Sequence, residues 1–195
     1  AFYVFELGTL LLCLFVGSHI LHASAESLLL PILAFPPLIW NFGLGQNAFL
    51  SAALLGAGTL LIDRRPFIAG MLFGVLCYKP HFGLILPFAL LAGRHWRALL
   101  GAAAGVAASI GLSVAVFGVA TWRAFLVSGT GAPAFYRSGQ IPFYNMASVF
   151  GAARLIGVPA QAAAAAQFAA ILLAILAVGW VWSRGAGLAV RAGVL

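Results

Sequence analysis

The segment from Arg64 to Arg97, RRPFIAGMLFGVLCYKPHFGLILPFALLAGRHWR, holds the only lysine of the chain in the middle of an apolar run. Basic residues bound this run on both sides. Insertion scales put a charged amine at the centre of a membrane helix at roughly +2.5 to +3.5 kcal/mol, so such a residue usually faces a cavity or a partner. Lys79, followed directly by Pro80 and His81, therefore marks the place where we expect chemistry.

The composition predicts an all-α integral membrane protein, a polytopic helical bundle. Of the 195 residues, 64% are hydrophobic and 7% are charged, and the mean hydropathy is +1.13. A soluble domain carries about 25% charged residues. The formal net charge of +7 arises from basic residues at the ends of apolar runs. Membrane proteins anchor their loops in this way, so we expect membrane lipids as partners and no nucleic acid.

Apolar runs predict the order of the helices. The segment from Leu28 to Trp40 is short and carries three prolines, which predicts broken helices in place of a plain crossing. The sequence is already apolar at Phe2, and its last residues, 190–195, lie inside what looks like another span. We therefore expect a single transmembrane domain, residues 1–195, that is a piece of a longer protein. The predicted spans are residues 2–20, 48–62, 98–117 and 160–182.

Two arrangements suit the segment 67–93. In the first, Lys79 lies at the tip of a hairpin of two short helices, each of about 12 residues and about 18 Å, too short to cross a core of about 30 Å. In the second, one long tilted helix carries Lys79 at its middle. The long helix would place Arg94 and Arg97 outside the cytoplasm, against the positive-inside tendency. The hairpin is therefore favoured, with Arg64, Arg65, Arg94, Arg97 and Arg184 in the cytoplasm.

The segment 118–159 is polar and aromatic compared with its neighbours. We expect it to form a long extracytoplasmic loop with a short interfacial helix at 147–156, since long loops are often functional. In the favoured topology it shares the outer face with Lys79 and with the Gly45-Gln46-Asn47 turn.

Three groups of residues are candidates for substrate binding. Lys79 and His81 suit a phosphate, and the alternative is a lysine that extends to the membrane interface. The amides of Gln46 and Asn47 suit sugar hydroxyls or a phosphate, and the alternative is an ordinary polar turn. Further candidates, whose alternatives are a helix cap at Asn145 and lipid head-group contacts, are Asn145, Ser148 and Arg137.

Acidic residues are too few for hydrolase-like chemistry. Glu6 lies near the start of a span, Glu26 lies in a turn, and Asp63 is expected to pair with the arginines beside it. Cys13 and Cys77 lie in apolar segments and form no metal-ligand pattern, so no metal or other cofactor is expected. The sequence assigns no catalytic residue.

An ordered series of short motifs resembles glycosyltransferase family 87, whose members are membrane enzymes of the GT-C fold. The series, which extends from about Leu28 to Gly157, consists of the proline-rich half-span, Gly45-Gln46-Asn47, Arg64-Arg65, Ala69-Gly70, Gly74, Lys79-Pro80, Arg94-His95-Trp96-Arg97, Asn145-x-x-Ser148, Gly151 and Arg154.

The resemblance implies a membrane glycosyltransferase. Such enzymes move a hexose, usually mannose, from a polyprenyl-phosphate carrier to a lipid or glycan acceptor on the extracytoplasmic side of a bacterial plasma membrane, with inversion at the anomeric carbon. The resemblance also implies a catalytic aspartate in an outer loop that would precede Ala1, and we expect no catalytic carboxylate within these residues.

Two alternatives remain open. Broken helices and a lysine at membrane depth also suit a transporter or lipid flippase. A non-catalytic membrane subunit that binds lipid or a partner is the third possibility.

Overall fold

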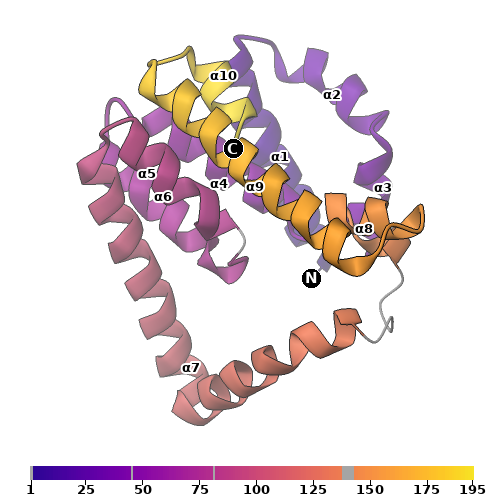
Figure 1. Cartoon of the computed structure of the whole chain (residues 1–195). Helices are drawn as coiled ribbons and strands as arrows, with labels where there is room; N and C mark the ends of the chain where they lie inside the picture. The colour runs from indigo at the N-terminus through magenta and orange to yellow at the C-terminus, as the bar shows by residue number, and fades with distance from the viewer. Residues whose placement is uncertain (1, 45, 81, 138–142) are drawn as a thin grey trace. The chain divides into compact units, whose positions relative to one another are not determined.

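The computed structural model describes residues 2–44, 46–80, 82–137 and 143–195, and these contain helices and no strand (Figure 1). The chain divides into two compact units, Ala1–Ser109 with Val178–Leu195, and Ile110–Ala177, and each is described by itself. The elements are α1 (Phe2–Leu21), α2 (Ala25–Leu33), α3 (Pro36–Leu44), α4 (Ala48–Leu61), α5 (Pro66–Val75), η1 (Leu76–Tyr78), α6 (Phe82–Ala92), α7 (Trp96–Arg137), η2 (Phe143–Asn145), α8 (Val149–Leu155), α9 (Ala160–Ser183) and α10 (Leu188–Gly193).

Three helices are long and apolar enough to cross a membrane: Phe2–Leu21, Trp96–Gly129 and Ala160–Ser183. Large apolar side chains cover the outer face of α1, where Leu7, Leu11 and Phe15 are each more than half exposed. A helix at the surface of a soluble protein carries polar residues on this face. Exposed apolar faces on long helices are suited to lipid, and the prediction of an all-α membrane protein is confirmed.

The segment 67–93 contains two short helices, not one long one. The α-helix of α5 ends at Val75, and after the single 3₁₀ turn of η1 the chain leaves the helical conformation at Lys79. Pro80 follows directly, and a proline cannot extend a helix that precedes it without loss of a hydrogen bond. Side chains of α5 and of α6 belong to the same core cluster, so α6 packs back on α5. The favoured hairpin is confirmed, and the single tilted helix is wrong.

Helices α1 and α4 run in the same direction, with α2 and α3 as the return connection between them. At their starts, Glu6 of α1 bonds to Asn41, which in turn bonds to the backbone of Ala48. One to two turns before the end of each helix, a Cβ atom added at Gly56 would meet the side chain of Val16. The prediction that the proline-containing segment forms short broken helices is confirmed by α2 and α3.

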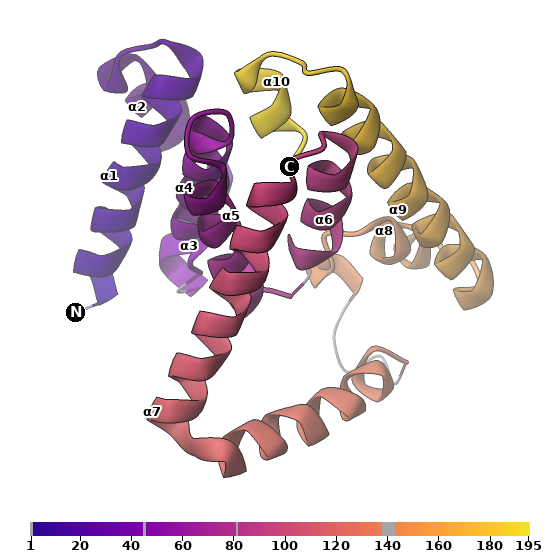
Figure 2. The same cartoon turned by 90° about the vertical axis from the view of Figure 1, so that its left-hand side faces the viewer.

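Helix α5 runs antiparallel to α4, beside which it lies in Figure 2. A Cβ atom at Gly58 would meet the ring of Phe73, and nearer the start of α4 the hydroxyl of Ser51 bonds to that of Tyr78. This antiparallel pairing carries the chain back from the end of α4 to its beginning. Lys79, the next residue after Tyr78, is therefore positioned near the turn that precedes α4.

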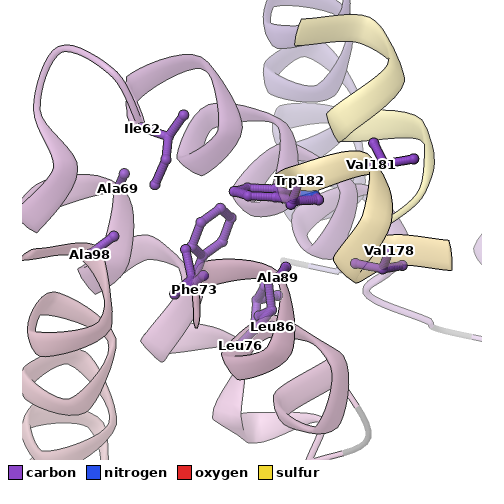
Figure 3. Packing of buried hydrophobic residues seen from close by; sticks show 11 residues of the cluster. Ile62, Ala69, Phe73, Leu76, Leu86, Ala89, Ala98, Val178, Val181 and Trp182 are labelled. Carbon is purple, nitrogen blue, oxygen red and sulfur yellow. The ribbon is translucent and has the colours of Figure 1, made fainter. Parts of the chain in front are cut away.

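The apolar core of the first unit lies where α4, α5, α6, α7 and α9 meet. Figure 3 shows Phe73 of α5, Trp182 of α9 and Ile62, the residue that directly follows α4, converging on it. Trp182 is 2% exposed and dominates the cluster by size. Because α9 contributes through Val178, Val181 and Trp182, the last turns of this helix are tied to the hairpin of α5 and α6.

Glycines allow α5 and α7 to approach until their backbones touch. A Cβ atom at Gly70 would collide with the carbonyl oxygen of Ala98, and one at Gly74 with that of Ala102. On the facing helix, a Cβ atom at Gly101 would collide with the carbonyl oxygen of Phe67. Small residues at four-residue spacing are the usual means by which membrane helices pack closely. The glycine- and alanine-rich start of α7 therefore packs closely against α5.

In the second unit, α7 bends sharply at Gly118, whose φ is 79° (Figure 1). A positive φ of this size strains the backbone of any residue other than glycine. The indole nitrogen of Trp122 donates to Ser113 across the bend at 3.1 Å. Helix then continues to Arg137, so segment 118–159 contains more helix than its polar composition predicts. The short helix expected at 147–156 is present as α8, and the outer position of the segment stays a prediction.

Gly74→Ala should lower the free energy of unfolding by about 1–3 kcal/mol, because the added methyl group must push α5 and α7 apart. Helix propensity alone predicts the opposite, a gain of up to about 1 kcal/mol. Gly8→Ala in α1 is the matched control, since a Cβ atom there meets nothing within 4 Å. Thermal unfolding in detergent measures both, and equal unfolding temperatures for the two variants would contradict the close approach.

Candidate functional site

Two of the predicted substrate-binding segments come together at the start of α4. One is the turn with Gln46 and Asn47, and the other is the connection between α5 and α6 that carries Lys79. Ser51, which is 4% exposed, links them. Its hydroxyl lies 3.0 Å from the carbonyl oxygen of Asn47 and 2.9 Å from the hydroxyl of Tyr78. We call the group Gln46, Asn47, Ser51, Tyr78 and Lys79 the polar end of the first unit.

The protons of this link can be assigned from chemistry. The carbonyl oxygen of Asn47 only accepts, so the hydroxyl of Ser51 donates to it. A serine hydroxyl has one proton, and Tyr78 must therefore donate to Ser51. The main chain of Asn47 and the residue before Lys79 are thus joined through two hydroxyl groups.

The side chains with predicted functions at the polar end remain available. Gln46 is exposed, and Asn47 and Lys79 are half-buried. Within the described part of the chain no hydrogen bond is formed by either side-chain amide or by the Lys79 ammonium group. One cation beside two amides can bind an anion whose neighbouring groups are hydroxyls. Gly45 and His81, also predicted here, lie outside the described residues.

The other predicted residues belong to the second unit. Ser148 begins α8 and accepts a hydrogen bond from the backbone of Gly151 at 3.0 Å. The capping alternative, which the sequence places on Asn145, thus falls on Ser148. Asn145 lies in η2 and Arg137 ends α7, and their side chains are outside the described part. Substrate binding by these three residues stays a prediction.

The opposite end of α4 is basic. With 14 residues, α4 separates the two ends by about 20 Å. Asp63 after α4 forms a salt bridge of 2.6 Å with Arg191 of α10, and the ring of His95 lies 5.7 Å from that of Trp182. These contacts bring together the segments that follow α4, α6 and α9 at one end of the first unit, which we call the basic end. Its further arginines are Arg64, Arg65, Arg94, Arg97 and Arg184.

The partner of Asp63 differs from the expected one. The sequence suggests the arginines beside it, but the carboxylate binds Arg191, 128 residues away, through two hydrogen bonds. These bonds lower the pKa of Asp63 below its ordinary value. Because Arg191 holds Asp63 in place, Arg64 and Arg65 stay exposed at the basic end.

A buried polar pair near the polar end is not predicted from the sequence. Glu6 of α1 is 1% exposed, and its carboxylate accepts a hydrogen bond of 2.7 Å from the side-chain amide of Asn41, which is 4% exposed. A signal was present, since an acidic residue inside an apolar run needs a partner. The partner lies 35 residues away on a helix that its prolines make difficult to place.

Among the described residues, no three histidine, cysteine or acidic side chains gather in a way that would hold a metal ion. The arrangement is therefore a cationic and amide-bearing end joined by hydrogen bonds to a buried carboxylate, at the end of α4 opposite to the arginines.

Comparison with known families matches the whole chain, residues 1–195, to the family described as Glycosyltransferase family 87. No curated protein and no solved structure matches it. The match extends beyond the region from Leu28 to Gly157 on which the resemblance rests. The protein is a membrane glycosyltransferase of helical fold, and the chain belongs to glycosyltransferase family 87.

Proposed function

We propose that this protein transfers a hexose, mannose in the first instance, from a polyprenyl-phosphate carrier to a lipid or glycan acceptor on the extracytoplasmic side of the membrane. The observation that carries the proposal is the polar end. There the segment with Lys79 is joined through Ser51 and Tyr78 to the turn with Gln46 and Asn47, and within the described residues the ammonium group and both side-chain amides form no hydrogen bond. The phosphate of the carrier would bind at Lys79, and the sugar would face the amides.

The chemistry places a demand on Lys79. When the acceptor hydroxyl attacks the anomeric carbon, the bond from that carbon to the phosphate oxygen breaks, and the lipid phosphate leaves with additional negative charge. A cation fixed at this position stabilises the transition state more than the ground state. Lys79 lies in a break between two helices, at the tip of the hairpin, where its half-buried side chain would bind the phosphate.

The distribution of charge supports an extracytoplasmic site. Arg191 and the five further arginines named above lie at the basic end, about 20 Å along α4 from the polar end. Loops rich in arginine and lysine stay on the cytoplasmic side of membrane proteins. We therefore place the basic end in the cytoplasm and the polar end on the outer side.

Membership of the family favours a transferase over the transporter or flippase alternative. The broken helices that also suit transporters have another explanation in this fold, since they place the polar end at the tip of the hairpin.

Lys79→Ala should reduce sugar transfer by about a hundredfold or more, the typical loss when one charge-stabilising group is removed from an active site. Lys79→Arg, which keeps the charge, should retain more activity than Lys79→Ala. The assay uses the full-length protein in membranes with polyprenyl-phosphate [¹⁴C]mannose, and product formation is followed over time.

The matched control is Arg97→Ala, an exposed cation at the basic end. It should stay within about twofold of the wild type, because no substrate charge develops near it. Normal turnover by Lys79→Ala, or an equal loss in both variants, would remove Lys79 from the proposed mechanism.

The two ends of α4 should label from opposite sides of the membrane. Gln46 at the polar end and Arg64 at the basic end are both exposed, and each can be replaced by cysteine after Cys13 and Cys77 are changed to serine. In intact cells a membrane-impermeant maleimide should modify Gln46→Cys and spare Arg64→Cys until the membrane is permeabilised. The reverse pattern would place the polar end in the cytoplasm.

A further inference from the structure

The carboxylate of Glu6 occupies an expensive position. It lies in the second turn of α1, 1% exposed, in a helix whose other residues are almost all apolar. Its oxygen Oε2 accepts from Asn41, and within the described residues Oε1 has no hydrogen-bonding partner. Burying a polar group without full satisfaction costs stability. A leucine would fill this position more favourably, so the carboxylate requires an explanation other than stability.

The contact with Glu6 decides which way the amide of Asn41 faces. A carboxylate accepts hydrogen bonds, so it selects the NH₂ group of Asn41 at 2.7 Å. The carbonyl oxygen Oδ1 must then point to the opposite side. There it accepts the backbone N–H of Ala48 at 3.1 Å. The orientation of the amide therefore follows from its two partners and is not arbitrary.

The bond to Ala48 closes the turn that carries Gln46 and Asn47. Ala48 is the first residue of α4, and Asn47 before it makes no side-chain cap. The first amides of a helix have no partner within the helix, and Asn41 supplies one of them. The main-chain carbonyl of Asn41 also accepts from the backbone of Gln46 at 3.0 Å. Both oxygens of Asn41 thus hold the chain between Asn41 and Ala48.

We propose that Glu6 is a positioning residue which, by orienting Asn41, holds the Gln46-Asn47 turn in the geometry needed to bind the sugar donor. This inference rests on the proposed function. The turn is then fixed from two directions. Glu6 and Asn41 connect it to α1, and the hydroxyls of Ser51 and Tyr78 connect it to the segment with Lys79. Asn41 is a positioning residue as well, because its Oδ1 accepts the backbone N–H of Ala48 at the end of the turn.

The decisive variant is the double substitution Glu6→Leu with Asn41→Leu. Removal of Glu6 alone leaves the buried NH₂ group of Asn41 unpaired and destabilises the fold, whereas replacing both members of this hydrogen bond by apolar groups costs much less. The double variant should fold, with an unfolding temperature somewhat below that of the wild type, because the backbone amide of Ala48 loses its partner Oδ1. Its KM for the polyprenyl-phosphate donor should rise by roughly tenfold to a hundredfold, since a displacement of about 1 Å in a binding group has effects of this size.

Two single variants complete the series. Glu6→Gln keeps an oxygen that accepts from Asn41, so its KM should stay within about threefold of the wild type. Thr9→Val is the matched control. Thr9 is buried one turn further along α1, and among the described residues its hydroxyl bonds to the main-chain oxygen of Glu6 alone. The substitution Thr9→Val removes a buried hydrogen bond from the same helix without affecting the turn, so the KM of this variant for the donor should be unchanged.

A second measurement is independent of activity. Hydrogen exchange of the backbone amides in residues 46–51 should be at least tenfold faster in the double variant and unchanged in Thr9→Val. If the wild-type protein fails to transfer sugar, the proposed function falls, and the exchange rates still decide whether the pair of Glu6 and Asn41 holds the turn. Wild-type exchange in the double variant, or a normal donor KM together with normal folding, would overturn the inference.

Discussion

The structure of the first unit depends on one constraint: a polar group at membrane depth must find its partner within the protein. The partners in this chain are distant in sequence and close in space. Glu6 meets Asn41, and Ser51 meets Tyr78. Both pairs lie at the start of α4. The first connects α1 to the turn with Gln46 and Asn47, and the second connects the end of η1 to it. Satisfying the constraint therefore also assembles the polar end.

Close helix packing makes this assembly possible. The hairpin of α5 and α6 is too short to be anchored by its own length, and it is held on one side by the glycine contacts with α7 and on the other by the pairing with α4. Because backbones touch along α5, the position of Tyr78 and Lys79 at its end is set with little freedom. A rigid scaffold around a short break in the helix is the arrangement that a precise binding site requires.

Much of this arrangement could be predicted from the sequence, because apolar runs, prolines and arginines have direct meaning for membrane helices. The broken segment before Gln46 follows from Pro31 and Pro36, and the hairpin at Lys79 follows from the arginines on both sides of it. The polar composition after Gly118 was misleading, since helix continues to Arg137 beyond a bend that only a glycine φ permits. Two contacts could not be predicted from the sequence, that of Glu6 with Asn41 and that of Asp63 with Arg191. These pairs are 35 and 128 residues apart, so packing brings them together and no local pattern reveals them.

The separation of charge along α4 connects the fold to the proposed reaction. Arginines that bind nothing in the site are useful at the basic end because they fix the orientation of the protein in the membrane. A lone lysine at the polar end needs a different reason, since it opposes that orientation. The proposed donor would supply that reason, because the phosphate of a lipid carrier would bring its negative charge to Lys79 together with its apolar tail. In that proposal the charge of the lysine is compensated when the donor is bound, and the cost of placing the lysine there would appear as affinity and selectivity for a lipid-linked phosphate.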